Sequence, residues 1–133
     1  MLLRTSTLLI KVLLIDAVVS GTTGLTMFTA AGPLAELLGL PAGLLRWAGL
    51  ALVPFAAFLL WLARQNPVPR GATLAVVAAN LLWTVASVAL LLSGRVAPTL
   101  LGTVFTLGQA VAVAVFAEFQ YVGLRRAQAI QPI

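Results

Sequence analysis

The sequence contains no histidine and no cysteine. Without histidine, the chain lacks the side chain that most often binds haem or zinc and that most readily exchanges protons near neutral pH. Without cysteine, it can form no disulfide, thiolate metal site or iron–sulfur cluster. We therefore expect no cofactor, no metal site and no enzymatic activity.

Charged residues are scarce as well. They make up 8% of the 133 residues, whereas a typical soluble domain has about a quarter. Hydrophobic residues make up 62%. A water-soluble domain of this size cannot cover its surface with so few charges. The composition predicts an integral membrane protein and excludes a soluble, disordered or nucleic-acid-binding chain, even though the net charge is +5.

Four apolar stretches have the length of about 20 residues that crosses a hydrocarbon core about 30 Å thick. Proline- or glycine-containing turns separate them, and the loops are too short for a soluble domain. The sequence therefore predicts one all-α domain over residues 1–133, an integral membrane four-helix bundle with up-down-up-down topology. Segment 33–40 is a candidate for a short interfacial helix. The predicted spans are approximately 8–29, 42–63, 72–92 and 99–122.

The first span shares two features with a cleaved signal peptide. Arg4 precedes it, and Val18-Val19-Ser20 within it resembles a cleavage site. However, Lys11 and Asp16 interrupt its apolar core. We therefore expect this span to remain as a membrane helix.

Basic residues are distributed unequally between the two sides of the predicted bundle. Short cytoplasmic loops of membrane proteins carry an excess of arginine and lysine. We therefore expect both termini to be cytoplasmic. Arginine outnumbers lysine, and alanine and leucine are abundant, which is typical of GC-rich bacteria and favours a bacterial inner membrane. The termini side holds Arg4, Arg64, Arg70, Arg125 and Arg126, and the opposite side holds Arg46 and Arg95.

Polar residues inside the apolar stretches are the candidate site residues. At 1.5 Å per residue, Asp16, Asn80 and Gln109 lie near the midplanes of the first, third and fourth spans. Each belongs to a polar stripe on one face of its helix, which we expect to face inward because lipid cannot pair with it. The predicted intramembrane polar cluster comprises Asp16, Ser20, Asn80, Thr84, Thr106 and Gln109.

This cluster has two interpretations. Amides and hydroxyls often serve only to hold membrane helices together, at about 0.6–2 kcal/mol each. Inserting a carboxylate at the centre of a span costs about 2.5–3.5 kcal/mol of free energy, and residues with a lower insertion cost can make the same helix contacts. Asp16 is therefore the best candidate for a substrate or proton site.

Lys11 and Glu118 are a second candidate pair. Both fall in the cytoplasmic third of the predicted bundle and away from the polar stripes. They are predicted to form an intramembrane ion pair between the first and last spans, to face a partner, or to extend separately toward the membrane surface.

The sequence resembles small bacterial four-helix membrane proteins of the DoxX-like type over roughly residues 1–92. The resemblance rests on Leu38-Gly39-Leu40-Pro41 and on Arg46-Trp47-Ala48-Gly49 at the start of the second span. A basic residue after the glycine that closes the first helix is missing in Gly24-Leu25-Thr26-Met27. Some DoxX-like proteins are accessory subunits of membrane redox enzymes. The size also resembles small multidrug transporters, in which a carboxylate of the first helix has the role that Asp16 would take here.

These observations predict a non-enzymatic accessory or structural membrane protein that acts through helix–helix contacts. Its expected partners are lipid and either further copies of the chain or a larger membrane complex, and no nucleic acid. The alternative is a small proton-coupled transporter with Asp16 as the coupling carboxylate.

The predicted topology can be tested by cysteine labelling in intact cells. Single cysteines placed between Arg64 and Arg70, or at the C-terminus, should resist a membrane-impermeant thiol reagent, whereas one beside Gly94 should react. The chain has no cysteine of its own, so only the introduced cysteine can react with the thiol reagent. Labelling of the first two sites would overturn the orientation.

Overall fold

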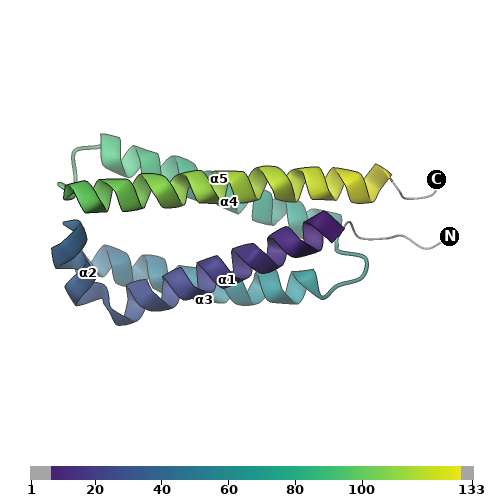
Figure 1. Ribbon diagram of the computed structural model, residues 1–133, viewed down its shortest axis with the longest axis horizontal. Coiled ribbons are helices and arrows are strands. Elements are labelled where there is room, and N and C mark those ends of the chain that lie inside the picture. Colours follow the sequence, from purple (N-terminus) through teal and green to yellow (C-terminus); the bar gives the residue numbers. More distant parts are fainter. Residues whose placement is uncertain (1–6, 130–133) are drawn as a thin grey trace.

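A computed structural model describes residues 7–129, which are entirely helical apart from turns and loops (Figure 1). The helices are α1 (Thr7–Thr29), α2 (Ala31–Leu38), α3 (Ala42–Ala63), α4 (Arg70–Leu92) and α5 (Leu100–Ala129).

Four of these helices, α1, α3, α4 and α5, are long and apolar enough to cross a membrane. The first three agree with the predicted spans to within two residues, and α2 corresponds to the expected short helix. The last helix extends seven residues beyond the predicted end at 122, because Leu124 and Ala127 are buried and continue its packing face.

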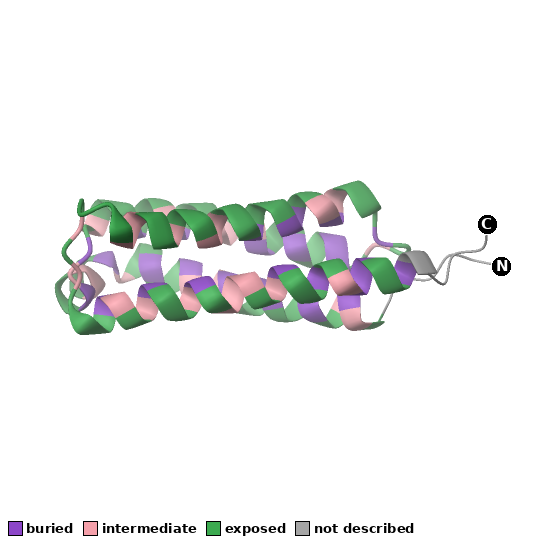
Figure 2. Ribbon diagram, turned by 90° about the horizontal axis from the view of Figure 1, so that it is seen from above, coloured by how far each residue is buried: buried purple, intermediate pink, exposed green. Residues whose placement is uncertain are grey.

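The long helices pack as two pairs. Helix α1 lies along α3, and α4 lies along α5, whereas α3 and α4 barely touch. The start of α1 and the end of α5 lie at the same end of the molecule, and the two helices diverge toward α2 (Figure 1). Buried residues occupy the sides of the helices that face one another (Figure 2). The helices are thus close together at the end where α1 begins and α5 ends, which we call the termini end. They are more widely separated at the opposite end, beside α2, which we call the α2 end.

Glycines allow the closest helix approaches. In the α1–α3 pair, a Cβ on Gly24 would lie 2.8 Å from the Cβ of Leu52 and 3.1 Å from the carbonyl oxygen of Gly49. Where α1 and α5 meet, a Cβ on Gly123 would lie 2.9 Å from the Cα of Leu9. Small residues have this role in many membrane bundles, because helix association in lipid depends on close van der Waals contact.

Helix α2 is fastened to the start of α5. Gly39 ends α2 in the left-handed conformation (φ 69°), which favours glycine. The Thr99 N–H then donates to the Leu38 carbonyl (3.0 Å), and its hydroxyl donates to the Leu37 carbonyl (2.9 Å). The same hydroxyl accepts from the Gly102 N–H (3.1 Å) and so caps α5. Thr99 therefore satisfies the ends of two helices at once.

Gly102→Ala should destabilise the protein, because a Cβ there would collide with the Leu38 carbonyl carbon and oxygen. We expect a loss of about 1–3 kcal/mol, as for other overpacked sites. Gly108→Ala in the same helix is the control: nothing lies within 4 Å of its Cβ position. It should be neutral or stabilise by about 0.5–1 kcal/mol. Apparent melting temperatures in one detergent provide the measurement, and equal values for both variants would contradict the packing.

Candidate functional site

Three helices bring a polar side chain to the same level near the termini end of the bundle. Asp16 lies nine residues after the start of α1, Asn80 ten residues after the start of α4, and Gln120 nine residues before the end of α5. Their exposed fractions are 0%, 3% and 0%. Together with the buried Ser20 they form what we call the polar cluster.

The carboxylate of Asp16 is the centre of the polar cluster. Its Oδ1 accepts a hydrogen bond from the Ser20 hydroxyl (2.8 Å). Its Oδ2 accepts from the amide groups of Asn80 (3.0 Å) and Gln120 (2.7 Å). The Asn80 amide also donates to Gln120 Oε1 (2.9 Å), which closes the network. The cluster thus joins α1, α4 and α5 by side-chain hydrogen bonds.

All three groups that face the Asp16 carboxyl are donors. Both oxygens of the Asp16 carboxyl group therefore have hydrogen-bond partners from neighbouring side chains. These hydrogen bonds offset part of the cost of removing the carboxyl group from water. No fully enclosed polar side-chain atom of the described residues lacks a partner. The cluster is therefore internally satisfied.

The structure separates Gln109 from Asp16, with which it was expected to cluster. Gln109 lies only nine residues from the start of α5, at the α2 end. There its Oε1 accepts from Trp83 Nε1 (2.7 Å), and its amide donates to the Ser87 hydroxyl and to the Thr106 carbonyl (both 2.9 Å). The reason is the length of α5. This helix has 30 residues, so it carries polar side chains at two depths, Gln109 at one and Gln120 at the other.

Gln120 is the cluster residue that sequence reasoning missed. The predicted end at 122 placed it at the edge of the membrane. Two signals were available. It follows Gln109 by eleven residues, about three helical turns, and so shares its face. Counted from the termini end, it also lies at the depth of Asp16 once α5 is known to reach Ala129.

The remaining candidates are dispersed. The Thr84 hydroxyl donates to the carbonyls of Asn80 (3.0 Å) and Ala110 (3.3 Å), a contact between α4 and α5. Lys11 and Glu118 are both exposed, and no ion pair joins them in residues 7–129. They point to the outside of the bundle because the inward faces of α1 and α5 hold Asp16 and Gln120.

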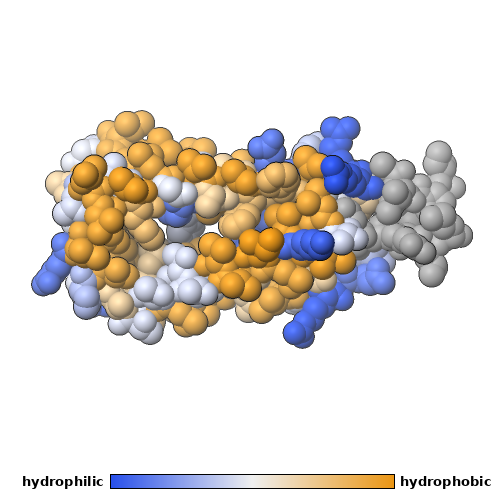
Figure 3. Space-filling view, in the orientation of Figure 1, coloured by the Kyte–Doolittle hydropathy of each residue, from blue (hydrophilic) through white to orange (hydrophobic). Residues whose placement is uncertain are grey.

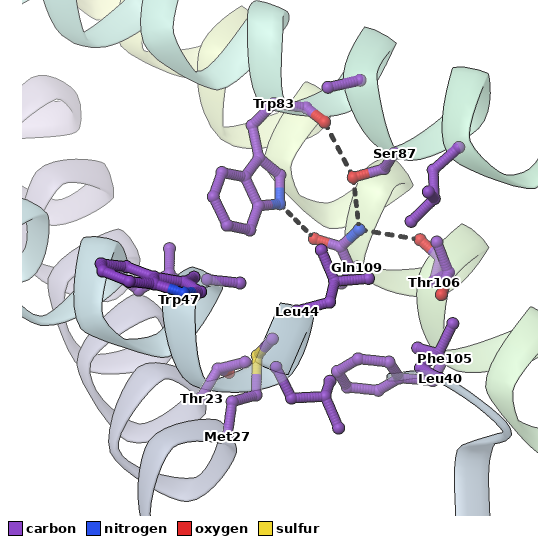
Figure 4. A pocket seen from close by; sticks show the side chains of 15 residues that line it. Thr23, Met27, Leu40, Leu44, Trp47, Trp83, Ser87, Phe105, Thr106 and Gln109 are labelled. Carbon is purple, nitrogen blue, oxygen red and sulfur yellow. Dashed lines mark hydrogen bonds between the residues drawn. The ribbon is translucent and has the colours of Figure 1, made fainter. Parts of the chain in front are cut away.

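A cavity of about 440 Å³ occupies the α2 end, where the helices diverge (Figure 4). All four long helices contribute to its wall. Figure 3 shows a hollow in this region, between α5 and α1. The volume lies within the range of roughly 300–1,000 Å³ that is usual for small-molecule sites. The wall is apolar and aromatic, with Met27, Leu44, Trp47, Leu52, Trp83 and Phe105 among the residues that line it.

Few polar groups reach this cavity, and none of the described residues that line it is charged. One side carries the Trp83–Gln109–Ser87 hydrogen-bond network (Figure 4). Next to it lies Thr106, a residue with only 5% of its surface exposed. An apolar wall with a small number of placed polar groups is typical of sites for lipophilic ligands.

A smaller cavity of about 160 Å³ lies next to the polar cluster and is lined by Ser20 and Asn80. Trp83 and Leu52 line both cavities. Trp83 therefore borders both the large cavity and the smaller cavity beside the residues that hold Asp16.

Replacing Asp16 tests the structural role of the cluster. Asp16→Leu should destabilise the protein, because the Gln120 amide and one N–H of Asn80 lose their acceptor, at about 1–3 kcal/mol for each buried group. Asp16→Asn should be mild: its carbonyl can take the place of Oδ2, and its amide can donate to the Ser20 oxygen. In thermal unfolding in detergent, the apparent melting temperature of Asp16→Asn should lie near that of the wild type, and that of Asp16→Leu should lie well below both. Equal loss in both variants would contradict this account.

Comparison of the chain with models of known families, with curated proteins and with solved structures finds no match.

Proposed function

We propose that this chain is a non-enzymatic, multi-pass membrane protein that binds an uncharged lipophilic small molecule inside its bundle. The observation that carries this proposal is the large apolar cavity at the level of the membrane-spanning helices. A molecule dissolved in the bilayer can reach such a site without crossing water.

The distribution of polar groups favours binding over chemistry. A general acid or base must lie within hydrogen-bonding reach of its substrate. Asp16 is the carboxylate inside the bundle, but it does not line the large cavity and its oxygens already accept three hydrogen bonds. Among residues 7–129, no group of three acidic side chains gathers that could hold a metal ion. The cavity wall can bind a ligand through its shape, its aromatic surface and a few hydrogen bonds.

Proton-coupled transport with Asp16 as the coupling group is the less supported alternative. Asp16 lines neither cavity, so a ligand in the large cavity does not contact the coupling carboxylate. The placement that we propose for either role is a bacterial inner membrane with both termini in the cytoplasm and an up-down-up-down bundle.

An accessory role is a second candidate, and Glu118 favours it. This carboxylate is exposed on an apolar helix, beside the exposed Phe119 and Val115. A carboxylate that faces lipid is costly, so a second copy or a partner helix that covers it would be stabilising. Native mass spectrometry after mild extraction tests this role, and a lone monomer would count against it.

Ligand binding can be measured by tryptophan quenching in liposomes. In a Trp47→Phe/Trp61→Phe background, Trp83 is the sole tryptophan and it lines the cavity. A bromine-bearing lipophile, 10-bromodecan-1-ol, should quench it in a saturable manner as its mole fraction in the lipid rises. Ala48→Phe, which fills the cavity, should abolish the saturable phase.

The matched control is Ala57→Phe, on the outer face of the same helix and away from both cavities. It should leave the saturable phase intact. Quenching that rises linearly in every variant reports only probe dissolved in the bilayer and would refute a binding site.

A further inference from the structure

We infer that the ligand of the large cavity is an uncharged lipophilic alcohol whose hydroxyl pairs with the Thr106 hydroxyl at the cavity wall. This inference rests on the proposed function and specifies the chemistry of the ligand. It depends on hydrogen-bonding capacity that the protein leaves unused at two residues of the cavity wall, Thr106 and Gln109.

The first unused group is the Thr106 hydroxyl. A threonine inside a helix usually donates to the carbonyl three or four residues earlier. Thr26, Thr73 and Thr103 do so here. The Thr106 hydroxyl has no partner among the described residues, although 95% of the residue surface is buried. Since no fully enclosed polar atom is left unpaired, this oxygen must face open space, and Thr106 lines the cavity (Figure 4).

The second unused capacity belongs to Gln109, three residues further along the same face of α5. Its amide uses both N–H groups, on Ser87 and on the Thr106 carbonyl. Its Oε1 accepts one hydrogen bond, from Trp83, and an amide oxygen can accept two. The site therefore offers one further acceptor at Gln109 and one hydroxyl at Thr106.

An alcohol suits either group, because its hydroxyl can accept a hydrogen bond from the Thr106 hydroxyl and can also donate one to Gln109 Oε1. A ketone or ether could use only Thr106, and a hydrocarbon could use neither. A carboxylate or ammonium group would enter a cavity whose described lining has no charge to pair with it, at high cost. The aromatic side chains of Trp47, Trp83 and Phe105 suit the apolar body of such an alcohol.

The test compares a bromine-bearing alcohol with the bromoalkane that lacks its hydroxyl group, on two threonine variants. The probes are 10-bromodecan-1-ol and 1-bromodecane, titrated by mole fraction in liposomes that contain the Trp83-only protein. Thr106→Val removes the hydroxyl and keeps the shape. It should weaken saturable binding of the alcohol by roughly three- to tenfold, the effect of one neutral hydrogen bond, and leave bromodecane binding unchanged. Thr103→Val is the control, because its hydroxyl bonds the Thr99 carbonyl and does not line the cavity.

The outcomes separate this inference from the proposed function. If both probes saturate with equal affinity, or if Thr106→Val affects both probes alike, the cavity binds lipophiles but the assigned hydroxyl contact is wrong. If neither probe saturates in the Trp83-only protein, the proposed function itself fails. Selective weakening of the alcohol by Thr106→Val, without an effect of Thr103→Val, supports the inference.

Discussion

The buried carboxylate of Asp16 is the constraint on which the packing of this protein depends. Lipid offers no hydrogen bonds, so a carboxyl group inside the bundle obliges neighbouring helices to supply donors. Helices α4 and α5 do so with Asn80 and Gln120, and their register relative to α1 is fixed by those contacts. The apolar contacts of Leu9, Leu13 and Leu124 surround the same end of the bundle. Polar pairing and apolar packing thus tighten one end, and the other end is left more open.

The cavity follows from this asymmetry. Helices α1 and α3 remain in contact through Gly24 and Gly49, whereas α1 and α5 diverge beyond the polar cluster. The space between them is bordered by large side chains that stand at its wall and do not fill it, notably Trp47 and Trp83. The hydrogen bond from Trp83 to Gln109 holds that indole in position, so the cavity is shaped by one polar contact in an otherwise apolar setting.

Local features were predictable from the sequence, and relations between helices were not. Length and hydropathy located α1, α3 and α4, because a span must be apolar for about 20 residues. The end of α5 was missed because its last turns pack through Leu124 and Ala127 among charged residues. The partners Asp16 and Asn80 were anticipated from their stripes, but Gln120 was assigned to the edge of the membrane. Neither the pairing of α1 with α3 nor the cavity can be inferred from periodicity, since both depend on how closely particular glycines allow two backbones to approach.

The double role of Thr99 bears on how a ligand would exchange. One residue holds the end of α2 and caps the start of α5, so lifting α2 would uncap α5 in the same movement. For the ligand that we propose, that coupling favours entry sideways between helices over entry past α2. The occupancy of the cavity would then depend on the concentration of the ligand within the lipid phase. Affinities expressed per litre of water would rank ligands mainly by their partition coefficients and would conceal the selectivity of the site.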